Sequence, residues 1–283
     1  MILSGGETLR QILMVPLSKA LSLHGREREA IAIFERIAQS SPNKSLKLQA
    51  LLNQAKRYME SRSYAEAAET LKRCIKIGKG QKLGAAYPCY VTLPKALKKS
   101  GRVSEAGRVY TDLLKRLATN DPRRIRIIRE FGLFVEAPLN NYDKALKLIR
   151  EAISISSKVK TDDHLKTKLL IDEARLLRKK GMFQLALKRI DQAKTPAQNI
   201  SPALANVWLE RARIYWYQGR YADALKSQKQ ALLIADQLGS SFLQIQCFSL
   251  EGLILLNQGD LELAKQRIEA ALLLAKKTNR KQE

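Results

Sequence analysis

The stretch VWLERARIYWYQGRYADALKSQKQAL, residues 207–232, places large aromatic side chains, small alanines and one glycine at fixed spacings. Gly219 is followed by Tyr221, Ala224 and Ala231. Similar spacings follow four other glycines, which are Gly25, Gly101, Gly181 and Gly259. Two further copies lack the glycine: SRSYAEAAETL with Tyr64 and Ala67, and LNNYDKALKLI with Tyr142 and Ala145. Most of the seven copies lie about 38–41 residues apart, and self-similarity at such a period is typical of a solenoid.

One repeat can be interpreted in physical terms. An amphipathic stretch of about 14 residues before each glycine predicts a helix, helix A, and the stretch after it predicts a second, helix B. The glycine supplies the positive φ of the turn between them. Ala224 is expected where the two helices cross, and Trp208, Tyr215 and Tyr221 are expected to fill the wedge between neighbouring repeats. Because no run alternates with the period of a strand, the expected fold is all-α.

Proline marks several helix starts, since the first helical residue needs no N–H donor. Ser41-Pro42, Asp121-Pro122 and Ser201-Pro202 are each predicted to be a cap followed by the first helical residue.

The repeat resembles the tetratricopeptide (TPR) signature in residue type and spacing. The matching residues are Trp208, Ala212, Tyr215, Gly219, Tyr221, Ala224 and Ala231, and in the last copy Phe248, Gly252, Leu255, Gly259, Ala264 and Ala271. The resemblance covers residues 11–278 and implies a right-handed superhelix, an α-solenoid of about seven helix-turn-helix repeats that forms one domain over 1–283. The repeats are expected at 11–47, 48–86, 87–124, 125–166, 167–204, 205–244 and 245–278. Since the usual TPR period is 34, the chain resembles the extended variety of about 40 residues.

Charge is the unusual feature of the composition. The chain has 51 basic and 27 acidic residues, a net charge of +24, and residues 43–199 hold 35 Lys and Arg against 15 Asp and Glu. Self-repulsion of this kind does not help folding, so the charge indicates an acidic partner, RNA included.

The sequence also bears on location and cysteine chemistry. No apolar run approaches the length of a membrane span, and the N-terminus lacks the features of a secretion signal, although an organelle transit sequence stays open. Cys74, Cys89 and Cys247 are odd in number and widely spaced, so neither a disulfide framework nor a zinc site is expected. An intracellular, reducing location is therefore predicted, cytoplasmic or nuclear, with an organelle matrix as an alternative.

Residues that could carry catalysis are sparse. His24 and His164 have no nucleophile near them in sequence and are expected at the surface near turns. The run IKIGKGQKLGAAY, residues 75–87, lacks the spacing of a phosphate-binding loop and is interpreted as an inter-repeat loop. The acidic pairs Asp162-Asp163 and Asp172-Glu173 are interpreted as solvated helix faces. No enzyme activity, cofactor or metal is predicted.

The resemblance implies that helix A lines a concave groove that binds extended peptides. With Trp208 as the fourth residue of its repeat, the ninth position points into the groove. That position is held by Lys19, Lys56, Lys95, Leu133 (allowing a one-residue slip in the fourth repeat), Arg175, Arg213 and Leu253. The next turns add Lys98, Lys99, Arg126, Arg129, Arg178 and Lys179, and the aromatic residues near this face are Tyr90, Trp216 and Tyr217. A basic inner stripe is predicted, whereas Lys188 and Arg189 are expected to point outward on helix B.

Two functions are compatible with such a stripe. One is a non-catalytic scaffold or adaptor that binds an acidic or phosphorylated protein segment. The alternative is an RNA- or ribonucleoprotein-associated protein that binds the phosphate backbone. The chaperone-binding TPR clamp is not reproduced, because the fifth positions are mostly apolar: Leu52, Val91, Ile171 and Leu209. The apolar C-terminal repeat is expected to dock on a partner or another copy, or to continue into a longer protein.

Overall fold

The computed structural model describes residues 16, 20–21, 24–79, 83–159, 161–197 and 201–280. Within those residues the chain forms 13 α-helices and one π-helical turn, without a strand. The helices pack as two compact units, residues 1–127 and 128–283, and the boundary between them falls inside α7. The expected all-α repeat fold is confirmed, while the single continuous domain stays a prediction.

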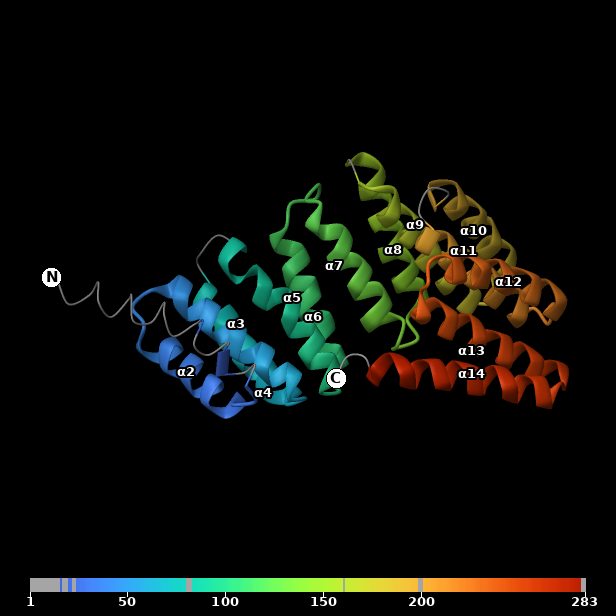
Figure 1. Cartoon of the computed structure of the whole chain (residues 1–283). Coiled ribbons are helices and arrows are strands. Elements are labelled where there is room, and N and C mark those ends of the chain that lie inside the picture. The colour runs from blue at the N-terminus through green and yellow to red at the C-terminus, as the bar shows by residue number, and fades with distance from the viewer. Residues whose placement is uncertain are drawn as a thin grey trace. The chain divides into compact units, whose positions relative to one another are not determined.

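Among the residues that the structure describes, the first unit contains two complete helix A segments and three helix B segments, as can be followed in Figure 1. Its helices are α2 (Glu27–Ser40), α3 (Lys44–Glu60), α4 (Tyr64–Gly78), α5 (Leu83–Lys99), α6 (Val103–Arg116) and the start of α7 (Arg123–Phe131). From α2 to α6 each helix packs against the next one along the chain, and the A helices α3 and α5 also contact each other. The A helices therefore share one face of this unit.

The second unit continues the same order of helices. It contains the end of α7, the π-helical turn η1 (Gly132–Glu136), α8 (Tyr142–Lys158), α9 (Asp163–Lys179), α10 (Phe183–Ala197), α11 (Ser201–Tyr217), α12 (Tyr221–Gln237), α13 (Ser241–Gln258) and α14 (Leu261–Arg280). The A helices α9, α11 and α13 contact one another in succession. We call the surface formed by the A helices of either unit its helix-A face.

The turn between helix A and helix B keeps a left-handed residue in all seven copies. Gly219 has φ 72°, and the other four repeat glycines named above also have positive φ. In the two copies without glycine the same position is taken by Arg62, with φ 61°, and Asn140, with φ 60°. The turn geometry is therefore kept even where its usual residue is absent.

The small residue predicted at the helix crossing is buried in every repeat. Ala224 is fully buried, as are its counterparts in the first five repeats, and the last counterpart is 2% exposed: Ala30, Ala67, Ala106, Ala145, Ala186 and Ala264. Trp208, Tyr215 and Tyr221 pack partly buried against the core of the second unit, as expected.

The one-residue slip predicted in the fourth repeat has a structural basis. At η1 the helix widens, and the Ala137 N–H donates a hydrogen bond to the Gly132 carbonyl at 3.0 Å. A π-helical turn accommodates one extra residue within a helix. Helix A of the fourth repeat therefore ends in this π-helical turn at Glu136, and turn residues 137–140 follow it.

The predicted helix starts were only partly right. Asn43, not Ser41, caps α3, and its side chain accepts a hydrogen bond from the Leu46 N–H at 3.2 Å. The Asp121 side chain accepts from the Arg123 N–H at 2.9 Å, as a cap would. Ser201 lies inside α11 as its first residue. The α3 correction follows from chemistry, because the Asn43 amide oxygen can reach the free N–H groups of the first turn.

The expectations for the first two cysteines and for residues 75–87 were wrong. Cys74 of α4 and Cys89 of α5 form a disulfide. Most of residues 75–87 belongs to these two helices. A Cβ on Gly78 would lie 2.6 Å from the Ala86 Cβ, so the glycine lets the two helices approach closely. The disulfide removes the premise from which a reducing location was predicted.

No helix in the described ranges is long and apolar enough to cross a membrane.

Candidate functional site

The residues of the predicted basic stripe divide between the two units. Those of the first unit are Lys56, Lys95, Lys98, Lys99 and Arg126, and those of the second are Arg129, Arg175, Arg178, Lys179 and Arg213. Lys19, the first ninth-position residue, lies outside the described residues. The stripe is therefore considered as two separate helix-A faces.

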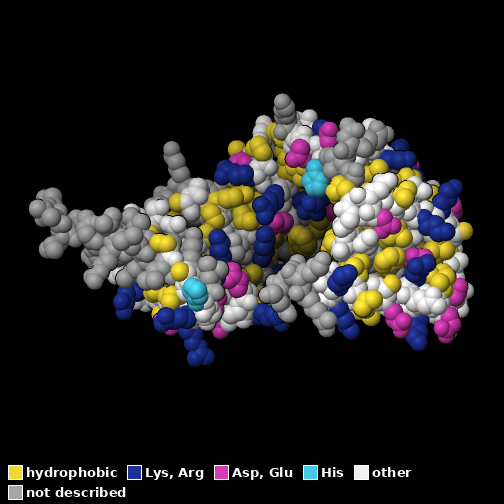
Figure 2. Space-filling model, viewed as in Figure 1, with side chains coloured by type: hydrophobic (Ala, Val, Ile, Leu, Met, Phe, Trp, Pro, Cys, Tyr) yellow, Lys and Arg dark blue, Asp and Glu magenta, His cyan; other side chains and the backbone are white. Residues whose placement is uncertain are grey.

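Lysine dominates the helix-A face of the first unit. Helix α5 carries Lys95, Lys98 and Lys99 and has no acidic residue, and Lys56 of α3 is exposed. The Lys99 Nζ lies 5.9 Å from the centre of the Tyr64 ring, within reach of a cation–π contact. Lysine and arginine side chains are seen gathered over the region around α5 (Figure 2).

The helix-A face of the second unit contains a cluster of arginines around two buried carboxylates. Arg178 Nε binds Glu210 Oε1 at 2.8 Å, and Arg213 Nη1 lies 3.3 Å from Glu210 Oε2. Arg175 lies between the carboxylates, with Nη1 3.5 Å from Asp172 Oδ1 and Nε 3.6 Å from Glu210 Oε2. We call this group the arginine–carboxylate cluster: Arg129, Asp172, Arg175, Arg178, Glu210 and Arg213.

Glu210 is fully buried, which would be costly for a charged side chain without partners. Burial by itself would raise the pKa of Glu210, but Arg178, Arg175 and Arg213 together outweigh burial and hold the pKa below its ordinary value. The carboxylate is therefore ionised in the folded protein and fixes the positions of three guanidinium groups.

Burial and nearby cations also act on the pKa of Asp172, but here burial has the larger effect. Burial raises the pKa of Asp172 above its ordinary value, although Arg129, Arg175 and Lys168 act in the opposite direction. Arg129 Nε donates a hydrogen bond to Asp172 Oδ2. Asp172 thus depends on its cations for its charge.

The interpretation of Asp172 and Glu173 as a solvated face was wrong. Asp172 is 2% exposed and Glu173 is 1% exposed. Glu173 faces α8 and α10, where Arg150 Nε donates a hydrogen bond to Oε1 at 2.8 Å and Arg189 Nε forms an ion pair with Oε2 at 2.9 Å. Arg189, which was expected to point outward on helix B, is half-buried and forms an ion pair with Glu173, whereas Lys188 is exposed. In contrast, Asp162 and Asp163 are exposed, and Asp162 caps α9.

Several predicted groove residues contribute to packing. Arg178 is 6% exposed, and its guanidinium carbon lies 4.6 Å from the centre of the Tyr217 ring. Trp216 packs partly buried against the core of the second unit. Tyr90 is 4% exposed and belongs to the core of the first unit. Of the three aromatic residues predicted near the groove, only Tyr217, at 52%, has a largely exposed side chain.

A pocket of about 130 Å³ adjoins the arginine–carboxylate cluster on the helix-A face of the second unit. We call it the anion pocket, and its lining residues are Arg129, His164, Thr167, Lys168, Ile171, Asp172, Arg175, Ala203 and Asn206. Its polar walls are rich in hydrogen-bond donors, while Asp172 is its one carboxylate and is already bound by Arg129. The pocket can therefore accept an anionic group.

The sequence predicted the arginines of this site but not what holds them. The partners are distant in sequence, because Arg129 and Asp172 are 43 positions apart and Arg178 and Glu210 are 32 positions apart. His164, Lys168 and Asn206 were not predicted at the site either. The repeat period could have identified the two buried carboxylates, because Asp172 and Glu210 occupy equivalent positions, three residues before Arg175 and Arg213.

The C-terminal helix pair exposes apolar side chains, as predicted. Leu261 is 63% exposed, Leu272 is 56% and Leu273 is 71% on α14, and Leu256 of α13 is 48% exposed. Docking of this surface on a partner or a second copy stays a prediction.

A sequence-family model for the tetratricopeptide repeat matches residues 205–237, within the repeat predicted at 205–244. No curated protein matches the chain. The family match therefore falls on α11 and α12, the helices of the stretch that first indicated the repeat.

Solved structures share the fold at low sequence identity. A tetratricopeptide repeat protein from Parabacteroides merdae is 16% identical, with a TM-score of 0.69 and 93% of each chain covered. The apo form of RapI is 14% identical, with a TM-score of 0.65 and coverage of 96% of this chain and 99% of RapI. A signal transduction ATPase with a tetratricopeptide repeat sensor from Pyrococcus horikoshii is 16% identical, with a TM-score of 0.65, and the match covers 92% of this chain and 41% of the ATPase. Residues 205–237 therefore match the tetratricopeptide repeat, and the helix pairs of the chain share the fold of solved tetratricopeptide-repeat structures.

Proposed function

We propose that the chain is a non-catalytic scaffold that binds an acidic or phosphorylated protein segment on the helix-A face of its second unit. Stacked helical repeats present extended surfaces, and proteins of this architecture serve in protein interactions. The anion pocket is the proposed point of recognition. It would take one carboxylate or phosphate group of the bound segment.

The observation that carries the proposal is the state of Arg175. Its distances of 3.5 and 3.6 Å to the two carboxylates are longer than strong charge-assisted hydrogen bonds, and its side chain is 40% exposed. Arg175 is thus held in place without being fully engaged. A guanidinium in that condition can offer paired N–H groups to an incoming anion.

The size of the anion pocket suits a single charged group, and the charge around the pocket favours a peptide over a nucleic acid strand. A volume of about 130 Å³ corresponds to about four waters at about 30 Å³ each, enough for one charged group. The RNA alternative draws on the net charge of residues 43–199. However, Arg175 and Arg213 share the buried Glu210, which leaves less positive charge on this face for a phosphate backbone.

The proposal is tested by fluorescence anisotropy with a short acidic peptide that carries one phosphothreonine. The variant Lys168→Gln, Arg175→Gln should bind it at least about tenfold more weakly, since hydrogen bonds to charged groups contribute about 1.5–3 kcal/mol each. The control Lys226→Gln, Lys229→Gln removes the same charge from exposed residues of α12 and should bind like the wild type.

Equal binding by the pocket variant and the wild type would overturn the peptide proposal. If oligouridylate binds the wild type more tightly than the peptide, and both variants weaken it equally, the RNA alternative holds instead. Circular dichroism of each variant establishes that the helices are intact.

A further inference from the structure

A groove of about 730 Å³ lies on the side of the first unit formed by helix B segments. Residues of α4 and α6 form its two walls, and Tyr90 and Leu93 of α5 contribute its floor. We call it the helix-B groove, and its lining residues are Lys72, Ile75, Lys76, Lys79, Tyr90, Leu93, Glu105, Arg108, Val109, Asp112 and Arg116. It contains none of the residues of the anion pocket.

The floor of the helix-B groove is apolar. Tyr90 and Leu93 form its base at 4% and 3% exposed, and the half-buried Ile75 of α4 and Val109 of α6 supply the apolar side chains that a ligand can reach. The Arg116 guanidinium lies 5.3 Å from the centre of the Tyr90 ring and closes one part of the floor. Such a floor favours a ligand with apolar side chains, because burial of apolar surface supplies the main favourable energy of docking.

The rim of the groove is basic, and part of its charge is unpaired. Lys76, Lys79 and Arg108 are exposed and have no acidic partner among the residues that the structure describes. The two acidic residues of the rim are already occupied: Glu105 Oε1 binds Lys72 Nζ at 2.6 Å, and Asp112 Oδ2 binds Arg116 Nε at 3.0 Å. The rim therefore attracts negative charge.

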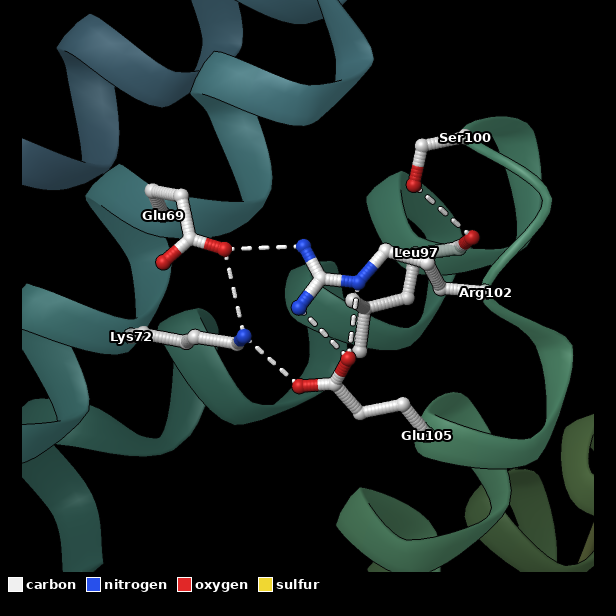
Figure 3. Close-up of polar contacts among 6 residues, drawn as sticks. All are labelled: Glu69, Lys72, Leu97, Ser100, Arg102 and Glu105. Carbon is white, nitrogen blue, oxygen red and sulfur yellow. Dashed lines mark hydrogen bonds and ion pairs between the residues drawn. The ribbon is translucent and has the colours of Figure 1, made fainter.

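A network of ion pairs joins the two walls of the groove (Figure 3). Lys72 of α4 binds Glu105 of α6, and Arg102, just before α6, binds both Glu69 at 2.8 Å and Glu105 at 2.6 Å. The same lysine also reaches Glu69 at 3.2 Å. Since α4 and α6 are linked across their gap, the groove is already formed before any ligand enters.

We propose that the helix-B groove docks an amphipathic helix of a partner protein, with an apolar stripe on the floor and acidic residues along the basic rim. A helix that lies between two helices presents side chains at i, i+3, i+4 and i+7 to such a groove. A bare phosphate polymer would leave the apolar floor uncovered. A second copy of this chain is disfavoured as the occupant, because its net charge of +24 would meet a basic rim.

The probe is a synthetic peptide of about 15 residues, a length at which isolated helices become marginally stable. It carries leucines at i, i+3, i+4 and i+7 with glutamates beside them, and a control peptide has the same composition with the leucine positions shuffled. Binding is measured by fluorescence anisotropy against the full chain. The shuffled peptide should bind at least about tenfold more weakly, because it cannot place its leucines on one face.

Two variants separate the rim from the floor. Lys76→Glu, Arg108→Glu should weaken binding of the patterned peptide at least about tenfold, and Val109→Ser should weaken it about three- to tenfold through the floor. The matched control is Lys226→Glu, Lys229→Glu, which makes the same charge change on α12 and should leave binding unchanged.

Equal binding of the patterned and shuffled peptides, or wild-type binding by the rim variant, would overturn this inference. Tighter binding of oligouridylate than of the peptide at this groove, lost in the rim variant and kept in Val109→Ser, would also overturn it and assign the groove to nucleic acid. The variant Lys168→Gln, Arg175→Gln should keep the full difference in affinity between the patterned and the shuffled peptide, because both peptides carry the same glutamates and only the patterned one fits the helix-B groove. Failure at one site is therefore distinguishable from failure at the other.

Discussion

Arg62 has the left-handed backbone conformation that glycine adopts at the equivalent turn of five other repeats. Asn140 has this conformation in the fourth repeat. For a residue other than glycine, the left-handed region costs about 1–2 kcal/mol of conformational energy, because the Cβ atom lies too close to the following carbonyl oxygen, although asparagine tolerates this region better than arginine. The arginine side chain is exposed and so gains little packing in return. The second repeat therefore contains local strain that its neighbours lack.

The variant Arg62→Gly should raise the free energy of unfolding by about 0.5–1 kcal/mol. Relief of about 1–2 kcal/mol of strain exceeds the entropy of about 0.5–1 kcal/mol that glycine loses on folding. Urea unfolding followed by circular dichroism measures the change. The reciprocal variant Gly101→Arg, at the next turn of the same unit, should lower stability. A destabilised Arg62→Gly would show that the arginine side chain contributes contacts that offset its strain.

Three helices of the first unit are tied together at one carboxylate. Glu35 of α2 accepts hydrogen bonds from Arg73 of α4, at 2.9 and 3.2 Å, and from Gln54 of α3 at 2.8 Å. The hydrogen bonds from Arg73 are the largest cause that lowers the pKa of Glu35 to about 2. Because the folded-state pKa is lowered, the stabilisation is present above the unfolded pKa of about 4.3 and is lost as the pH falls toward 2.

Acid should therefore weaken the α2–α3–α4 packing over that pH range, and Arg73→Gln should remove part of the effect. The wild type should lose more free energy of unfolding between about pH 4.5 and about pH 2.5 than the variant does, by about 1–2 kcal/mol. Urea midpoints at the two pH values give the comparison, in which the other carboxylates cancel. Identical losses in the two proteins would mean that Arg73 does not hold the Glu35 carboxylate in solution.

The elements that the sequence predicted well are those with a local signature. Helix pairs, left-handed turns and crossing alanines repeat with one period, and the shifted register in the fourth repeat indicated the insertion that η1 absorbs. Contacts between repeats have no local signature. Cys74 and Cys89 lie 15 residues apart on different helices, and Asp172 is surrounded in sequence by lysines and arginines typical of an exposed face. The basic stripe was predicted, whereas its partial neutralisation by buried carboxylates depends on the packing of neighbouring repeats.

Across the whole molecule, a net charge of +24 opposes compaction. Many cations pair with carboxylates, but 51 basic residues cannot all be matched by 27 acidic ones. Salt should therefore stabilise the fold. Raising NaCl from about 10 to about 100 mM shortens the screening length from about 30 to about 10 Å and should raise the urea midpoint. A midpoint that falls with salt would show that attractive ion pairs outweigh the general repulsion.

Glu210 also limits how the chain can be rearranged. It belongs to α11, whereas Arg175 and Arg178 that it binds belong to α9, in the preceding repeat. The buried guanidinium of Arg178 thus has its counterion in the following repeat. Repeats of this protein are consequently not interchangeable modules: deletion, duplication or shuffling of the segment that contains α11 would separate a buried cation from its anion. Engineered recombination within the second unit should succeed only when these two helices are exchanged together.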